Sequence, residues 1–119
     1  MPSGKVIYSQ RDILLTKFPF SDLRRFKVRP VLVLSNDAYN RRFSDLVICA
    51  ITSALRPHPY AARVGSQDLE EGVLKVESQV RADTITSLEQ QIVLKKIGRL
   101  RRETYRGVVA LIDKLIHAG

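Results

Sequence analysis

Residues Lys27 to Ser35 constrain the fold of this chain more than any other stretch. The segment runs through Arg29-Pro30 into four consecutive apolar residues, Val31 to Leu34. Short β-branched and aliphatic runs are typical of strands that are buried on both faces. Because proline lacks an N–H and fixes its φ angle, we expect Pro30 to open a strand over 30–35. Arg29 then lies at the rim of a core strand, where its charge is held in place.

Further short segments with apolar or alternating residues predict more strands. They are 12–18, 46–53, 60–64, 73–80 with an extension over 83–87, and 93–100. Gly98 within the last of these indicates a bulge or a close backbone approach. The acidic stretch 67–72 ends in Gly72, a glycine that suits a turn. We expect a short helical turn over 37–42, capped by Ser35 or Asn36.

The apolar period changes in the final segment and predicts an amphipathic helix. The residues at i, i+3, i+4, i+7 spacing are Tyr105, Val108, Val109, Ile112, Leu115 and Ile116. No Ser, Asp or Asn stands directly before this helix at Arg101-Arg102, so its start lacks a capping side chain. Several short strands followed by one helix predict a mainly β fold, a small barrel or strongly bent sheet with the helix packed on it. We expect one domain over 1–119, with 1–10 as a flexible lead-in.

The net charge of +8 points towards a polyanionic partner. Arginine supplies 13 of the 20 basic residues, and its guanidinium binds phosphate through two parallel hydrogen bonds and stacks on bases. An acidic protein partner, or a basic surface without any nucleic-acid role, fits the same charge. No segment is long and apolar enough to span a membrane. The single cysteine, Cys49, cannot form an internal disulfide, which fits the cytoplasm.

Metal-binding and nucleophile motifs are missing from the sequence. His58 and His117 are far apart, and neither has a Cys or His at ligand spacing. There is no glycine-rich phosphate loop and no GxSxG motif. Cys49 lies in the middle of an apolar run, which is typical of a core residue. We therefore expect no metal and no cofactor.

The residues that remain for chemistry are arginine, threonine and serine. If strands 30–35 and 46–53 are antiparallel neighbours, Arg29 and Thr52 face a common rim, a layout that suits a phosphate. The side chains expected around them are Arg24, Arg25, Lys27, Ser53 and Arg56. Taken alone, Arg29 could equally pair with Asp12 or Asp45, and Gln79 could either contact a base or finish a strand.

RNA would suit such a site because it carries its own nucleophile, the 2′-hydroxyl. A cleaving enzyme then has to align that oxygen, stabilise the added negative charge and move two protons. Arginine and threonine can stabilise the charge. Arginine stays protonated in proteins and is a poor proton acceptor, so the sequence offers no evident general base.

Several groups of residues, in their order and spacing, resemble the PemK/MazF toxin family over about residues 10–117. They are 12–15, 18–22, 28–37, 50–53, 72–73, 78–81 and 96–100 before the last helix. The resemblance implies an SH3-like barrel with a C-terminal helix that works as a homodimer. It also implies a type II toxin with a cognate antitoxin, whose acidic tail covers the RNA groove. The toxin would contact DNA only indirectly, through that antitoxin.

The same resemblance implies a metal-independent endoribonuclease that cleaves single-stranded RNA at selected sequences, leaving 2′,3′-cyclic phosphate and 5′-hydroxyl ends. The family's catalytic pair falls on Arg29, for proton transfer or transition-state binding, and on Thr52, for stabilising the phosphorane. Arg11 stands where the family usually has glycine. The basic loop 23–27 also departs from the family pattern, so the RNA sequence that this chain would cleave is left open.

Two other functions remain compatible with the sequence. One is a gyrase-poisoning protein of the same fold, like CcdB, although those relatives rely on a C-terminal tryptophan and this chain has no tryptophan. The other is an RNA-binding barrel without catalysis, which would share the same charge and bind RNA with a steep salt dependence.

Overall fold

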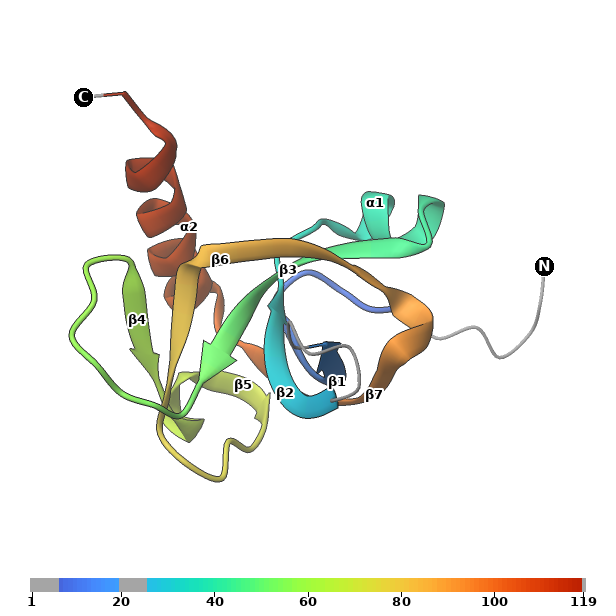
Figure 1. The fold of residues 1–119 in the computed structure, drawn as a ribbon, viewed down its shortest axis with the longest axis horizontal. Helices are drawn as coiled ribbons and strands as arrows, with labels where there is room; N and C mark the ends of the chain where they lie inside the picture. Colours follow the sequence, from blue (N-terminus) through green and yellow to red (C-terminus); the bar gives the residue numbers. More distant parts are fainter. Residues whose placement is uncertain (1–6, 20–25, 119) are drawn as a thin grey trace.

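A curled antiparallel sheet forms the body of the protein, and a C-terminal helix packs on it (Figure 1). The computed structural model describes residues 7–19 and 26–118. Within these ranges, seven strands follow the order β4-β6-β3-β2-β1-β7-β5. They are β1 Asp12–Pro19, β2 Phe26–Val33, β3 Asp45–Thr52, β4 Ala61–Val64, β5 Leu69–Gly72, β6 Ser78–Glu89 and β7 Val93–Leu100. The helices are α1 Asp37–Arg42 and α2 Arg102–Ile116. The predicted fold class is confirmed.

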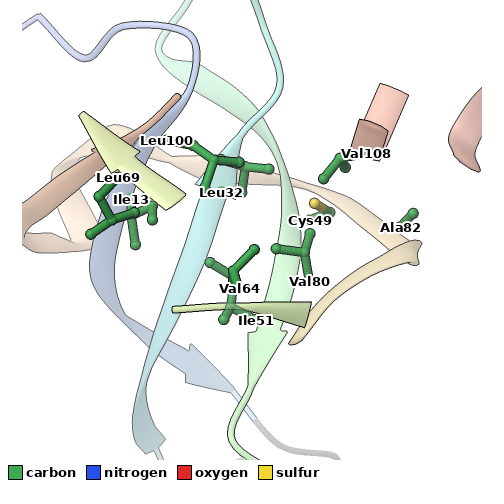
Figure 2. Close-up of a cluster of buried hydrophobic side chains, with 10 residues drawn as sticks. All are labelled: Ile13, Leu32, Cys49, Ile51, Val64, Leu69, Val80, Ala82, Leu100 and Val108. Carbon is green, nitrogen blue, oxygen red and sulfur yellow. The ribbon is translucent and has the colours of Figure 1, made fainter. Parts of the chain in front are cut away.

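One buried cluster draws side chains from every one of these strands and from α2 (Figure 2). Its members are Ile13, Leu32, Cys49, Ile51, Val64, Leu69, Val80, Ala82, Leu100 and Val108. Burial raises the pKa of the Cys49 thiol to about 12, so at neutral pH this thiol is protonated. Cys49 is therefore a core residue and not a nucleophile, as its position in the sequence predicts.

The central strands are buried on both faces because the sheet curls over itself. Val31 and Val33 point into a second buried cluster with Leu14 and Ile48, while Leu32 between them belongs to the first. The far side of this second cluster is covered by Tyr8, Ile92 and Val93 from within the same chain. Curling of the sheet thus provides the cover that a single helix cannot give.

Two predicted strand boundaries are wrong. β2 begins at Phe26, and Pro30 lies inside it, paired with Leu15 of β1. The first β2–β3 pair is Val31 with Ala50, so the missing N–H of Pro30 interrupts no described β2–β3 pair. The alternating segment 73–77 is not a strand. Its backbone is instead tied at Leu74, whose N–H and C=O both bond to the Ser66 hydroxyl at 3.0 Å.

The long strand β6 bends, and the predicted extension over 83–87 is part of it. Its pairing with β3 jumps from Ile85 opposite Cys49 to Arg81 opposite Ala50. β6 has extra residues at this point, and they turn the strand. Both halves of β6 pair with β3, and the half that contains residues 78–81 also pairs with β4. Figure 1 shows β6 crossing the molecule from β4 towards the side of α1.

The two helices agree with the sequence in their positions and caps. Asn36 caps α1 by accepting a hydrogen bond from the Tyr39 N–H at 2.8 Å. No side chain caps α2, which begins after Arg101. Of the predicted apolar stripe, Val108 is buried, and Tyr105 and Ile112 pack against the first cluster. Tyr105 also donates its hydroxyl to the Leu34 carbonyl at 2.9 Å. The other three members, Val109, Leu115 and Ile116, are exposed, so that part of the prediction is wrong. Among the described residues, no helix has the length and apolar character needed to cross a membrane.

Two backbone positions near β7 explain local features of the sequence. Gly98 lies at a register shift between β1 and β7, and a Cβ there would come 2.8 Å from the Glu71 carbonyl, which confirms the predicted close approach. Arg11 adopts a φ of 80°, a left-handed conformation that favours glycine. This conformation accounts for the glycine that the resembling family usually has at this position.

Replacing Gly72 with alanine is expected to destabilise the protein by about 2–4 kcal/mol, because it combines overpacking with a left-handed backbone. Gly72 has a φ of 86°, and a Cβ there would lie 2.1 Å from the Ile97 carbonyl oxygen. Thermal unfolding followed by circular dichroism measures the loss. Gly107→Ala is the matched control, since nothing lies within 4 Å of its Cβ, and alanine should stabilise α2 by up to about 1 kcal/mol. Equal melting temperatures for the two variants would contradict the close contact.

Candidate functional site

Arg29 and Thr52 lie opposite one another where the β2–β3 ladder ends. The described pairs run from Val33 with Ile48 to Val31 with Ala50, and the same register continued by two residues sets Arg29 opposite Thr52. Both side chains are half-buried and both line the same two hollows in the surface. The predicted antiparallel arrangement of these strands is confirmed. The catalytic roles of the two residues stay a prediction.

The first hollow, of about 330 Å³, lies between β2, β3 and the segment 73–76. Its basic lining residues are Lys27, Arg29, Lys75 and Lys95, and Ser53 also lines it. No Asp or Glu is among its described lining residues. Exposed valines at 28, 73 and 76 give it an apolar wall beside these charges. Such a mixture suits a nucleotide, which has an anionic backbone and an apolar base.

Two more hollows continue from the first along the β3–β4 loop. The second, of about 340 Å³, shares Arg29, Ile51 and Thr52 with the first and adds Arg56 and Arg81. The third, of about 220 Å³, shares Arg56 with the second and adds Arg63. We call the joined hollows the basic track, with cations Lys27, Arg29, Arg56, Arg63, Lys75, Arg81 and Lys95. Among described residues, no carboxylate lines the track, so it offers a continuous path for a polyanion.

Thr52 keeps its hydroxyl hydrogen as a donor within the track. Its Oγ1 accepts a hydrogen bond from the Ala54 N–H at 3.1 Å, which uses a lone pair and leaves the O–H group to donate. The bond also orients the side chain at the end of β3. Thr52 can therefore donate a hydrogen bond to a phosphate oxygen that Arg29 binds.

An Arg81–Asp83–His58 cluster lies beside this pair. The Asp83 carboxylate accepts from Arg81 Nε at 2.9 Å and Nη2 at 2.8 Å, and His58 Nε2 lies 3.4 Å from Asp83 Oδ2. Hydrogen bonding from Arg81 lowers the pKa of Asp83. His58 Nδ1 accepts the Tyr60 N–H at 3.0 Å, and His58 Nε2 also lies 3.2 Å from Arg81 Nη2. The lowered pKa makes the Asp83 carboxylate a weak proton acceptor.

This cluster was not predicted from the sequence. One signal was present, since Arg81 and Asp83 are two residues apart in a strand and so share a face. The third member comes from the β3–β4 loop, and only the fold brings His58 next to β6. The cluster neutralises Asp83 and fixes the guanidinium of Arg81 at the wall of the second hollow.

Gln79 anchors a loop, and its amide groups are both engaged. It is 4% exposed; its Oε1 accepts the Arg56 N–H at 3.0 Å and its Nε2 donates to the Arg56 carbonyl at 3.1 Å. These bonds favour a positioning role for Gln79 over the base contact considered from the sequence.

The other predicted RNA-binding residues lie on the track where the structure describes them. Arg56 and Ser53 are exposed on the track, and Lys27 lines its first hollow. Arg24 and Arg25 lie outside the described residues.

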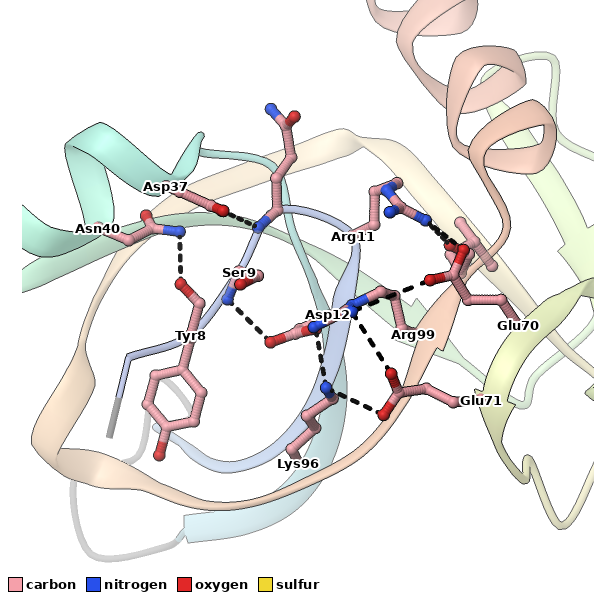
Figure 3. Close-up of polar contacts among 12 residues, drawn as sticks. Tyr8, Ser9, Arg11, Asp12, Asp37, Asn40, Glu70, Glu71, Lys96 and Arg99 are labelled. Carbon is pink, nitrogen blue, oxygen red and sulfur yellow. Dashed lines mark hydrogen bonds and ion pairs between the residues drawn. The ribbon is translucent and has the colours of Figure 1, made fainter. Parts of the chain in front are cut away.

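The alternative in which Arg29 pairs with Asp12 or Asp45 does not fit the fold. Asp12 is 2% exposed and accepts from Arg99 Nε at 2.9 Å and from the Ser9 N–H at 2.8 Å (Figure 3). Asp45 starts β3, seven residues before Thr52, which corresponds to about 23 Å along a strand. Among the described residues, no group of three His, Cys, Asp or Glu side chains is arranged to hold a metal ion.

Solved structures with the same fold include several toxins. A *Mycobacterium tuberculosis* toxin, MazF-mt6, is 19% identical, with a TM-score of 0.71 over 87% of this chain and 94% of that one. A MazE–MazF structure from *Deinococcus radiodurans* is 20% identical, with a TM-score of 0.78 over 93% and 97%. An endoribonuclease in complex with its cognate antitoxin, from a mycobacterial species, is 18% identical, with a TM-score of 0.76 over 94% and 99%.

A comparison with curated proteins finds no matching sequence. A family model gives a direct match. The model for the PemK-like, MazF-like toxin of type II toxin–antitoxin systems matches residues 9–116, nearly the whole chain. The matched range contains the curled sheet, helix α2 and every residue of the basic track. The chain belongs to the PemK-like, MazF-like toxin family of type II toxin–antitoxin systems.

Proposed function

We propose that this toxin is a metal-independent endoribonuclease that cleaves single-stranded RNA at selected sequences. The observation that carries the proposal is the position of Arg29 and Thr52 within the basic track, where two hollows without acidic lining residues adjoin. The endoribonuclease activity named for a structural neighbour with the same fold supports it. The exposed valines support binding of unpaired bases over a rigid duplex, whose bases are stacked inside.

The proposed chemistry uses the 2′-oxygen of the substrate as the nucleophile. This oxygen bonds to the adjacent phosphorus while the bond from phosphorus to the 5′-oxygen breaks, giving a 2′,3′-cyclic phosphate and a 5′-hydroxyl. One proton leaves the 2′-hydroxyl and one is delivered to the 5′-oxygen. Arg29 and Thr52 donate hydrogen bonds to the phosphorane oxygens, where negative charge develops. Stabilising this charge is the main contribution that we assign to the site, because Arg29 and Thr52 are hydrogen-bond donors.

The proposal includes a cognate antitoxin and a second copy of the chain. An antitoxin with an acidic tail complements the basic track and would exclude RNA from it, and one structural neighbour is an endoribonuclease in complex with its cognate antitoxin. Contact with DNA would come only through that antitoxin. We place the toxin in the cytoplasm as a homodimer, in keeping with its single, buried, reduced cysteine and with its family.

Purified toxin incubated with a mixed single-stranded RNA in excess EDTA tests this function. We expect cleavage at a small set of sequences, because no step in the proposed chemistry passes through a metal ion. The new 5′ ends should accept phosphate from a polynucleotide kinase without prior dephosphorylation. RNA that is bound but never cut would instead support a non-catalytic RNA-binding barrel. Trapped gyrase–DNA complexes without RNA cleavage would support a gyrase poison.

A further inference from the structure

The β3–β4 loop is held rigid at three places. Both backbone groups of Arg56 bond to the buried Gln79 amide. His58 accepts the Tyr60 N–H at 3.0 Å, and the Tyr60 carbonyl accepts the Ala82 N–H at 2.9 Å. Prolines at 57 and 59 restrict the loop further. A loop fixed in this way presents its exposed side chains in one arrangement, which lowers the entropy cost of binding a ligand.

Two unbalanced positive charges lie beside the third hollow, Arg56 on the rigid loop and Arg63 on strand β4. Arg56 and Arg63 line the third hollow and are exposed, and neither side chain has an ion-pair partner among the described residues. Arg63 lies on the edge strand β4, opposite Gln79 of β6 in the ladder. The other described lining residues are Pro57, His58, Ala61 and Gln79, so no carboxylate offsets the charges. Two like charges beside one hollow favour occupation by an anion.

We propose that the third hollow is a second phosphate subsite, in which Arg56 and Arg63 bind an RNA backbone phosphate beside the scissile one. This inference rests on the proposed RNA substrate. The third hollow shares Arg56, His58 and Gln79 with the second, and the second contains Arg29 and Thr52. A strand bound at Arg29 therefore continues into the third hollow on one side only. The subsite fixes the position of the substrate and takes no part in the bond changes.

A binding measurement tests the subsite independently of cleavage. The ligand is a fluorescent single-stranded RNA with a 2′-deoxynucleotide at the mapped cleavage site, or the unmodified RNA if wild-type protein does not cut it. We expect Arg63→Ala and Arg56→Ala each to weaken binding about tenfold. Each should also reduce the slope of log affinity against log salt by about 0.7. Arg106→Ala, which removes an exposed arginine of α2 outside the track, is the control and should stay within twofold of wild type.

Neutral methylphosphonate linkages identify the phosphate itself. Introduced one at a time, they should weaken wild-type binding at the scissile position and at one nearby position on a single side. At that nearby position, the penalty should be smaller in Arg63→Ala than in wild type, because only Arg56 then binds the phosphate. The inference is overturned if Arg63→Ala binds RNA as tightly as Arg106→Ala does. It is also overturned if the methylphosphonate at the nearby position weakens binding equally in wild type and in Arg63→Ala. Cleavage of RNA with unchanged binding by the Arg63 variant would remove the subsite and leave the proposed function standing.

Discussion

Arg29→Ala is expected to lower kcat for RNA cleavage by about 10²- to 10³-fold, the usual effect of removing a donor that stabilises transition-state charge. The loss should appear in kcat because Arg29 binds charge that develops on the phosphorane, while the rest of the basic track still binds the substrate. The fold should survive, since Arg29 lies where the β2–β3 ladder ends and belongs to neither buried cluster. Single-turnover cleavage of a defined RNA, with urea unfolding of the same preparation, measures both quantities.

Two further variants test whether the loss of kcat depends on the guanidinium group of Arg29. Arg29→Lys keeps the charge and loses the paired hydrogen-bond geometry, so its rate should fall between those of wild type and Arg29→Ala. Arg106→Ala removes the same charge from α2 and should leave kcat unchanged. An Arg29→Ala protein that cleaves within threefold of the wild-type rate would show that the site has been assigned wrongly.

Asp12→Asn is expected to reduce the free energy of unfolding by about 3 kcal/mol, in the range for removing one partner from a buried ion pair. Asp12 is nearly inaccessible and holds Arg99, Lys96 and the Ser9 N–H together between β1, β7 and the N-terminal segment (Figure 3). The expected loss is at the low end because Arg99 and Lys96 are partly exposed and also pair with Glu71. Equilibrium unfolding in urea measures the change from the shift in midpoint at constant slope.

Glu71→Gln is the matched control for Asp12→Asn. It removes a carboxylate from the same network, but Glu71 is half-exposed, so its ion pairs are worth less than about 1 kcal/mol. An Asp12→Asn protein as stable as Glu71→Gln would mean that the buried carboxylate contributes no more than a surface charge.

The helices and strands of this fold could be predicted in segments where a single hydrophobic periodicity dominates. The apolar runs of β2 and β3, the helical stripe of α2 and the cap at Asn36 follow local rules that leave a direct trace in the sequence. The segment 73–77 alternates like a strand but forms none, because its backbone is held by Ser66 outside the sheet. Local periodicity carries no information about that distant hydroxyl.

The part of the candidate site that depends only on which strands are neighbours could be predicted from the sequence. Placing Arg29 beside Thr52 required only that two neighbouring strands be antiparallel. Placing His58 beside Asp83, or Arg56 against Gln79, required knowing how the β3–β4 loop folds back on β6. These contacts join residues that are 23 and 25 positions apart in the chain, and local periodicity does not record them.

The central claim, that the basic track cleaves RNA through the substrate's own hydroxyl at Arg29 and Thr52, is tested most directly by one substitution in the RNA. A substrate with a single 2′-deoxynucleotide on the 5′ side of the scissile phosphate is incubated with the toxin in EDTA. We expect cleavage at that position to disappear, while the same substitution one nucleotide away leaves it intact. Cleavage of the deoxy-substituted site at the rate of the all-ribose site would contradict the account, because the nucleophile would then come from elsewhere.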